Sequence, residues 1–255
     1  MGVDYKKEGR IAIFTINRPE QRNALDLEAR QQLVEAMINF RDDPELWVGI
    51  ITGAGDRAFC SGRDVSGDRN QPSGGRRAPD TSMEVWNLGD KIMKPLIAAI
   101  NGYALGGGLE VALGCDIRIA SENARLAVPE VTLGMSGAGG SQRLARFLPR
   151  AIASWMILSG QQIDAQEAYR VGLVNKVVPL DQLMPTAMEL AGIICQAAPL
   201  ATRLAKEVII RGIEMTLEQS LQLQRDLSSR YAAPEDRMEG AKAFAEKRKP
   251  VWKGR

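Results

Sequence analysis

Short apolar runs recur along roughly the first 180 residues of the chain, and turn-forming residues separate them. Most runs are rich in β-branched side chains, which is typical of buried strands. After the first run, apolar side chains recur at helical spacing from Asp26 to Phe40, and Asp26 is a candidate N-cap. This alternation of strand and helix patterns predicts an α/β fold with parallel strands. The expected strands cover residues 11–17, 47–52, 95–100, 117–120 and 175–178.

The pattern becomes almost wholly helical after about residue 181. The last expected helix carries an apolar stripe, Leu217, Leu221 and Leu223, which could cover a neighbouring chain or pack within its own chain. We therefore expect association between copies of the chain, with packing inside one chain as the alternative. The helices expected in this part cover residues 188–196, 201–213 and 217–231.

The charge balance and the cysteines narrow the classes of function. The chain holds 33 basic and 31 acidic residues, a net charge of +2, which gives no general attraction to nucleic acid or membranes. No apolar run approaches the ~20 residues that span a bilayer, and the N-terminus lacks the apolar segment of a secretory signal. The three cysteines are widely spaced, which favours a reducing environment. We expect a cytoplasmic protein without a membrane or nucleic-acid partner.

The chain contains no histidine. Catalytic triads built on histidine and metal ligation by imidazole are therefore excluded, and we expect no metal site. Acid–base chemistry near neutral pH must fall mainly on carboxylates, Lys, Cys or Tyr.

One glycine motif has a plain structural interpretation. The stretch ITGAGDRA, residues 51–58, formally matches the dinucleotide-binding fingerprint after a strand. That fingerprint requires a helix directly afterwards, whereas FCSGRD follows here with a further glycine. We therefore prefer a simple connection between a strand and a loop.

The stretch NGYALGGGLE, residues 101–110, places three glycines before an expected helix start near Leu109. The first N–H groups of a helix lack internal partners and carry partial positive charge. Glycines would let a substrate oxygen approach these groups, so an oxyanion hole could form from backbone alone, and Glu110 would stand beside it. The alternative is a tight turn that packs the helix against a sheet.

Glu130 stands in a second glycine-rich constellation. It follows Pro129, and the loop that comes after it holds four glycines before another expected helix with the sequence SQRLARFL. An isolated glutamate in such a segment is usually a solvated surface residue. Its apolar flanks and the glycine-rich turn behind it make Glu130 a candidate catalytic residue.

Six stretches of the sequence, given at the end of this paragraph, resemble the enoyl-CoA hydratase/isomerase (crotonase) family. They span nearly the whole chain and occur in the family's order. The resemblance implies a spiral of ββα units over residues 1–195, which carries the site, and a helical region over 196–255 that trimerises. It also implies an acyl-CoA thioester substrate and a homotrimer or homohexamer. The matching stretches are NRPEQRNALD (17–26), AFCSGRDV (58–65), AAINGYALGGGLEVALGCDIRIA (98–120), LAVPEVTLGMSGAGGSQRL (126–144), VGLVNKVVP (171–179) and EGAKAFAEKRKPVWKGR (239–255).

The resemblance also implies roles for particular residues. The backbone N–H groups of Arg63 and Gly107 would hold the thioester oxygen, and Glu110 and Glu130 match the two glutamates of the family's hydratases. Coenzyme A is part of the substrate, so no separate cofactor is expected. The residues implied near CoA or the thioester are Ala24, Ser61, Asp64, Val65, Ser66 and, near the CoA phosphates and sometimes from a neighbouring subunit, Lys247 to Lys249.

The leading hypothesis is an enoyl-CoA hydratase, which adds water reversibly to a trans-2-enoyl-CoA. Arg63 and Ser136 depart from the Ala and Pro common at these places, and the loop over 66–80 differs freely among such enzymes, so the acyl preference stays open. Residues 39–59 and 243–255 resemble the carnitinyl-CoA dehydratase branch, which is one alternative. An isomerase needs a single base, so two acids disfavour it. Some relatives bind RNA, but the near-neutral charge argues against that here.

Overall fold

The computed structural model describes residues 2–64, 85–136 and 138–255, and these residues form two β-sheets. The strands are β1 (Val3–Glu8), β2 (Ile11–Ile16), β3 (Val48–Gly53), β4 (Ala58–Cys60), β5 (Leu96–Ile100), β6 (Tyr103–Leu105), β7 (Ile117–Ser121), β8 (Arg125–Ala127), β9 (Ile163–Asp164) and β10 (Lys176–Val178). The larger sheet has the order β1-β2-β3-β5-β7-β10, and the smaller has the order β4-β6-β8-β9. The strands from β2 to β10 in the larger sheet run parallel, as predicted, whereas β1 is antiparallel to β2 and β9 to β8.

The chain passes repeatedly from the larger sheet to the smaller one. β3 leads into β4, β5 into β6, and β7 into β8, and the three short strands pair in parallel. The helix α3 (Gly107–Leu113) follows β6, while η4 (Glu130–Leu133) and α4 (Ala138–Phe147) follow β8. Each step therefore adds one strand to each sheet and then turns back through helix or loop, which is the predicted spiral of ββα units.

The helix α1 (Leu27–Asp42) forms where the periodicity predicts it. The Asp26 side chain accepts a hydrogen bond of 2.8 Å from the Ala29 N–H, a cap worth about 1 kcal/mol. On its buried face, Phe40 packs edge-on against Phe14 of β2, with ring centroids 5.7 Å apart. The helix thus covers one face of the larger sheet.

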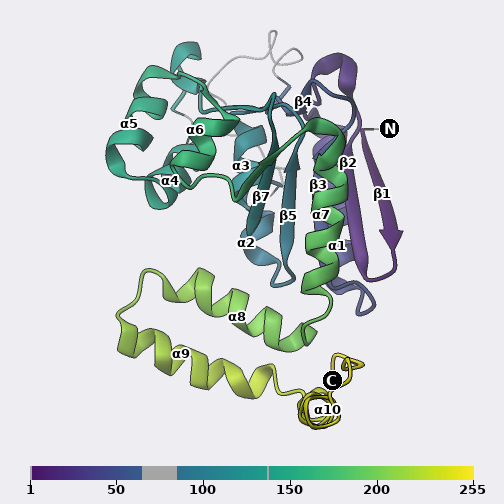
Figure 1. Cartoon of the computed structure of the whole chain (residues 1–255). Coiled ribbons are helices and arrows are strands. Elements are labelled where there is room, and N and C mark those ends of the chain that lie inside the picture. The colour runs from purple at the N-terminus through teal and green to yellow at the C-terminus, as the bar shows by residue number, and fades with distance from the viewer. Residues whose placement is uncertain (1, 65–84, 137) are drawn as a thin grey trace.

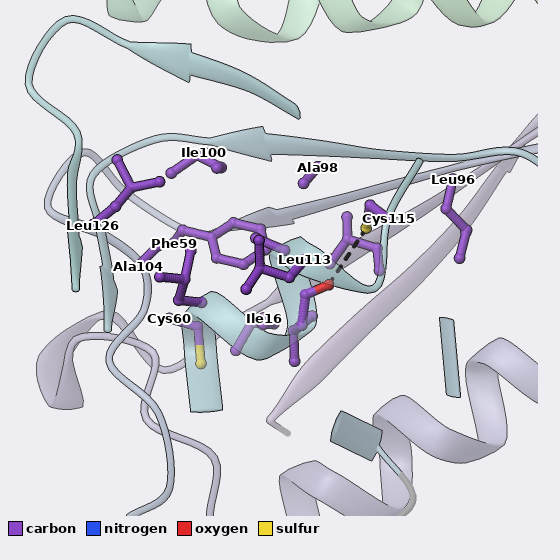
Figure 2. Packing of buried hydrophobic residues seen from close by; sticks show 14 of the residues in the cluster. Ile16, Phe59, Cys60, Leu96, Ala98, Ile100, Ala104, Leu113, Cys115 and Leu126 are labelled. Atoms are coloured by element: carbon purple, nitrogen blue, oxygen red, sulfur yellow. Dashed lines mark hydrogen bonds between the residues drawn. The ribbon is translucent and has the colours of Figure 1, made fainter. Parts of the chain in front are cut away.

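Alternating side chains along the sheet point to two separate apolar clusters. On the face of α1, Ala98 and Ile100 of β5 pack with Phe59 and Leu113, so that α3 closes the same core (Figure 2). The neighbouring β5 residue Ile97 belongs to the second cluster, together with residues of α7 (Leu180–Ile194). In Figure 1, α7 runs along the sheet and covers this opposite face.

The helices α8 (Pro199–Gly212), α9 (Leu217–Arg230) and α10 (Pro234–Ala245) form a layer set apart from the sheets in Figure 1. Lys206 of α8 connects this layer to the core, because its Nζ lies 2.7 Å from Asp116 Oδ2 and donates to the Lys94 carbonyl oxygen over 2.9 Å. The predicted division at residues 195 and 196 falls between α7 and α8, and its status as a domain boundary stays a prediction.

Several elements differ from the sequence-based expectation. β1, the short strands of the smaller sheet and α10 were not predicted. The helix α4 begins at Ala138 and so takes in Gly139 and Gly140, which had been expected in a loop. The described residues also include η1 (Pro19–Gln21), α2 (Leu88–Lys91), α5 (Arg150–Ser159) and α6 (Ala165–Arg170).

Within the described ranges, no single helix has the length and apolar character needed to cross a bilayer. α7 and α8 meet the criterion only as a pair, and they are bent by 106° at the break between them.

Candidate active site

The candidate site is built around the first turn of α3. β6 ends at Leu105, and Gly106 then turns the chain with φ 54° and ψ −125° before the helix begins at Gly107. Only glycine adopts such a conformation readily. The Gly107 N–H has no acceptor inside its own helix and carries part of the positive end of the helix dipole. The three glycines therefore form a turn that presents a backbone donor.

The segment after β4 lies directly against this turn. A Cβ on Gly108 would stand 1.9 Å from the Cys60 carbonyl oxygen, and a Cβ on Gly62 would stand 3.3 Å from the Gly107 nitrogen. Gly62 itself has a φ of +98°. Glycine at these positions lets the chain preceding Arg63 touch the start of α3.

Arg63 is held by an isolated parallel bridge to Leu25. The Leu25 N–H donates to the Gly62 carbonyl oxygen over 2.8 Å, and the Asp64 N–H donates to the Leu25 carbonyl oxygen over 3.0 Å. In a bridge of this pattern the N–H of the central residue points to the opposite side. The Arg63 N–H therefore points away from Leu25. Its predicted role in holding a thioester oxygen stays a prediction.

Glu110 lies one turn into α3 and is 7% exposed. Its Oε1 accepts a hydrogen bond of 2.5 Å from the Gly140 N–H in the first turn of α4. A Cβ on Gly139 would stand 2.8 Å from the same oxygen, so the glycines of this turn allow the close approach. A carboxylate at a helix N-terminus is stabilised by the dipole and by the unpaired N–H groups.

Glu130 reaches the same end of α3 from the start of η4. A Cβ on Gly106 would stand 2.8 Å from its Oε1, and among the described residues its buried Oε2 has no hydrogen-bond partner. Burial raises the pKa of the Glu130 carboxyl above its ordinary 4.5; a hydrogen bond with its own backbone lowers it, and the charge of Glu110 raises it again. The structure thus brings together two carboxyl groups that lie twenty residues apart in sequence.

Three other titratable groups of the described residues, two buried thiols and Lys94, are unsuited to acid–base chemistry at this turn. Burial raises the pKa values of the Cys60 and Cys115 thiols to about 12, so neither supplies a thiolate near neutral pH. Burial lowers the pKa of Lys94 to about 8, but its ammonium donates to the carbonyl oxygens of Phe40 and Asp43, away from α3. The roles of Glu110 and Glu130 as the acid–base pair stay a prediction.

Sequence reasoning missed Trp86, which lies over the glycine turn. Its ring atoms come within 2.8–3.1 Å of the place that a Cβ on Gly107 would take, and the residue is 7% exposed. A tryptophan outside any recognised motif gave no signal of this contact.

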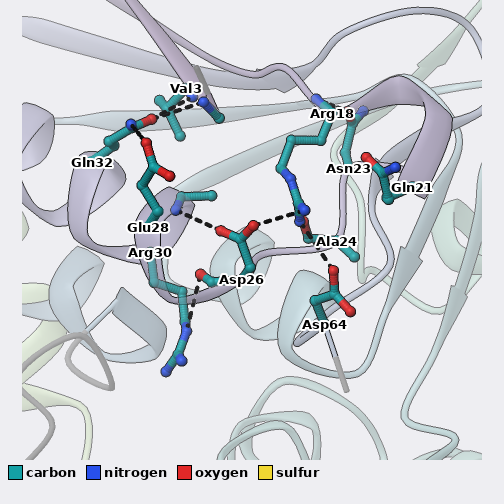
Figure 3. A network of polar contacts seen from close by, with 12 residues as sticks. Val3, Arg18, Gln21, Asn23, Ala24, Asp26, Glu28, Arg30, Gln32 and Asp64 are labelled. Atoms are coloured by element: carbon teal, nitrogen blue, oxygen red, sulfur yellow. Dashed lines mark hydrogen bonds and ion pairs between the residues drawn. The ribbon is translucent and has the colours of Figure 1, made fainter. Parts of the chain in front are cut away.

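The structure places only some of the predicted CoA-binding residues near Arg63. Ala24, Ser61 and Asp64 lie around the bridge at Arg63, and Figure 3 shows Asp64 beside the Arg18 guanidinium. Val65, Ser66 and the loop over 66–80 lie outside the described residues. The segment that follows α10 and holds Lys247 to Lys249 lies next to α10 at the lower right of Figure 1, remote from α3 of the same chain in the upper half of the view. Contacts with CoA stay predictions.

Comparison with known proteins identifies the chain. A sequence model described as enoyl-CoA hydratase/isomerase matches residues 6–255. The short-chain-enoyl-CoA hydratase of Clostridium acetobutylicum is 41% identical over 97% of this chain and 95% of its own, and the carnitinyl-CoA dehydratase of Proteus mirabilis is 41% identical over 97% and 96%. The crystal structure of an enoyl-CoA hydratase from Bacillus anthracis superposes with a TM-score of 0.93, at 38% identity and full coverage of both chains.

The chain belongs to the enoyl-CoA hydratase/isomerase family and has the crotonase fold. This membership and the named relatives confirm the predicted class of enzyme, a hydro-lyase that acts on acyl-CoA thioesters.

Proposed function

We propose that this enzyme adds water to a short-chain trans-2-enoyl-CoA to give a 3-hydroxyacyl-CoA, and catalyses the reverse elimination. The observation that carries the proposal is the meeting of the Glu110 and Glu130 carboxyl groups at the N-terminal end of α3. The hydratases among the relatives support the same reaction. No separate cofactor takes part, because CoA belongs to the substrate.

The thioester oxygen would bind between the N–H groups of Arg63 and Gly107. When water attacks the β carbon, negative charge builds up on this oxygen, and preorganised donors stabilise it. Removal of one such donor costs about 3 kcal/mol of barrier in other enzymes. A Cβ on Gly62 would stand 3.3 Å from the Gly107 nitrogen, and this proximity supports the convergence of the two donors.

The two glutamates would divide the proton transfers. Glu110, whose Oε1 accepts from the Gly140 N–H, would take a proton from the attacking water. Glu130, with its raised pKa, is suited to be protonated and gives its proton to the α carbon. The hydroxyl group is thus added at the β carbon and a proton at the α carbon, so the product carries the same charge as the substrate. The proton gained by Glu110 returns to Glu130 before the next turnover.

The dehydration of carnitinyl-CoA is the second candidate. The similarity to the Proteus mirabilis enzyme equals that to the short-chain hydratase at 41%, so identity alone does not separate them. An enoyl-CoA isomerase is disfavoured, because the shift of a double bond needs one base and the site offers two carboxyl groups. A panel of 2-enoyl-CoA, 3-enoyl-CoA and crotonobetainyl-CoA, with product analysis, separates the three activities.

The proposal includes a homotrimer or homohexamer located in the cytoplasm. Ile209, Ile213 and Leu217, on α8, α9 and the turn between them, are more than half exposed in the single chain. Such exposed apolar side chains are typical of an interface between subunits.

The test replaces each glutamate by glutamine and follows the loss of absorbance of the conjugated thioester. We expect Glu110→Gln and Glu130→Gln each to lower kcat by about 100-fold or more, since each removes one proton transfer. Glu35→Gln, on the exposed side of α1, is the matched control and should keep full activity. Unchanged turnover in both site variants would refute the mechanism.

A further inference from the structure

Arg18 lies between two carboxylates that come from different parts of the chain. Its Nη2 is 2.7 Å from Asp26 Oδ2, and its Nη1 is 3.3 Å from Asp64 Oδ2 and donates to the Ala24 carbonyl oxygen. The Arg18 side chain is 17% exposed, so solvent screens these contacts only in part. Figure 3 shows the guanidinium spanning the space between the two acids.

The two acids are attached to different structural elements. Asp26 caps α1 through its other oxygen, Oδ1, which accepts from the Ala29 N–H. Asp64 directly follows Arg63, whose amide is the proposed donor to the thioester oxygen. Arg18 therefore connects a well-anchored helix start to the residue next to that amide.

The side chain of Asn23 holds the backbone of Arg18 in place. Asn23 has a φ of 56° and is fully buried, and its Nδ2 donates to the carbonyl oxygens of Ala54 and Ala58 over 3.0 Å and 2.6 Å. Its Oδ1 accepts from the Arg18 N–H over 2.9 Å. The backbone of Arg18 is thus fixed to the end of β3 and the start of β4, and only its side chain reaches Asp64.

We propose that Arg18 is a positioning residue that sets the direction of the Arg63 N–H in the oxyanion hole. The inference rests on the proposed function. The peptide at Arg63 takes part in an isolated bridge with Leu25, and the Arg18–Asp64 contact is a further restraint on the same short segment. A misplacement of about 1 Å at a catalytic group can cost about 100-fold in rate. The planar fork of arginine binds Asp26 and Asp64 at once, which the single ammonium of lysine does less well.

The experiment compares Arg18→Lys, Arg18→Gln and Asp64→Asn with Arg170→Gln, which breaks the exposed pair with Glu167 on α6. Three quantities are measured: kcat and KM for a 2-enoyl-CoA, the melting temperature, and the absorption maximum of bound 2,4-hexadienoyl-CoA. This maximum moves to longer wavelength when hydrogen bonds polarise the thioester carbonyl, so it reports the oxyanion hole rather than folding.

We expect Arg18→Gln and Asp64→Asn to lower kcat by at least 10-fold with little change in KM and to reduce the shift of the absorption maximum. Arg18→Lys should recover part of both, and Arg170→Gln should behave as the parent enzyme. If Arg18→Gln does not fold, the same measurements of kcat and of the absorption maximum on Asp64→Asn test the inference.

Two results would overturn the inference in distinguishable ways. A lower melting temperature with unchanged kcat and an unchanged absorption shift would show that Arg18 only stabilises the fold, while the proposed function stands. If the parent enzyme itself neither hydrates enoyl-CoA nor shifts the bound dienoyl-CoA spectrum, the proposed function fails and the inference fails with it.

Discussion

Glu110 and Glu130 differ in what surrounds their carboxyl groups. Glu110 receives a backbone N–H from the start of α4, whereas the buried Oε2 of Glu130 has no partner in the part of the chain that the structure describes. An unpartnered buried acceptor costs about 1–3 kcal/mol, and the cost grows when the group is charged. Burial thus disfavours a charge on Glu130 and raises its pKa, which suits this carboxyl group to give a proton.

This difference predicts a pH-dependent stability. The pKa of Glu130 is raised in the folded state, so its proton stabilises the fold below the ordinary pKa of 4.5, and this contribution is lost as pH rises through the folded value. Glu130→Gln cannot ionise and should therefore melt at a higher temperature than the parent enzyme at pH 8. The difference should shrink towards pH 4.

Thermal melts across this pH range make the measurement, and Glu35→Gln on the exposed side of α1 serves as the control. A Glu130→Gln variant whose advantage does not change with pH would contradict the assignment of a proton to Glu130.

At the scale of elements, the site depends on how closely α3 approaches its neighbours. Gly108 is the tightest point, because a Cβ there would stand 1.9 Å from backbone, the Cys60 carbonyl oxygen, which cannot rotate away. At the end of the same helix, Gly114 has ordinary helical angles, φ −73° and ψ −9°, and a Cβ there would meet its nearest atom at 3.5 Å. The two glycines thus have different reasons to be present.

We predict that Gly108→Ala costs about 1–3 kcal/mol of stability or more and abolishes most activity, because α3 must move away from β4. Gly114→Ala should be neutral or stabilising by about 0.4–1 kcal/mol, since it only restricts the unfolded chain. Urea denaturation and hydratase assays of both variants test this. Equal effects of the two changes would show that the contact with Cys60 does not position the helix.

The sequence predicted the long parallel strands and α1 because their apolar periodicity is strong, as in residues 47–52. It missed β1, an edge strand whose sequence VDYKKE contains four charged residues and therefore has no strong apolar pattern. It also missed the smaller sheet, because its strands are at most three residues long. It placed Gly139 and Gly140 in a loop, because glycine usually breaks helices. Here they start α4, where a side chain would collide with the Glu110 carboxylate.

For the candidate site, the glycine turn and Glu110 could be inferred from adjacent residues and helix physics. The approach of Glu130 could not, because a separation of twenty residues does not fix a distance; the family resemblance supplied it. Trp86 and Arg18 act through contacts between segments remote in sequence, and no local pattern marks such contacts.

At the scale of the molecule, α8 to α10 form a layer that connects to the core at few points. Lys206 makes the buried connection to Asp116 and to the Lys94 carbonyl oxygen. Beyond it, Ile209 and Ile213 expose 67% and 74% of their surface, which a single chain leaves uncovered. This layer is suited to reach a neighbouring subunit.

We predict that light scattering gives the mass of three or six chains and that Ile213→Asp lowers it, because a charge at an apolar interface loses its hydration without a partner. Gln31→Asp, at an exposed polar position of α1, is the control for an added charge and should keep the assembly. A parent enzyme that is monomeric at micromolar concentration would contradict the predicted assembly.

The three glycines at the start of α3 are neighbours in sequence, yet each one faces a different part of the chain. Gly106 faces the Glu130 side chain, Gly107 faces the Trp86 ring, and Gly108 faces the Cys60 backbone. A change at residue 107 could be compensated by a smaller side chain at position 86, but no substitution removes the Cys60 carbonyl oxygen that faces Gly108. Gly106 is restricted in another way, because its φ of 54° strains any other residue whatever stands at position 130. Over evolution only the middle glycine of the three can therefore vary through a change elsewhere in the chain.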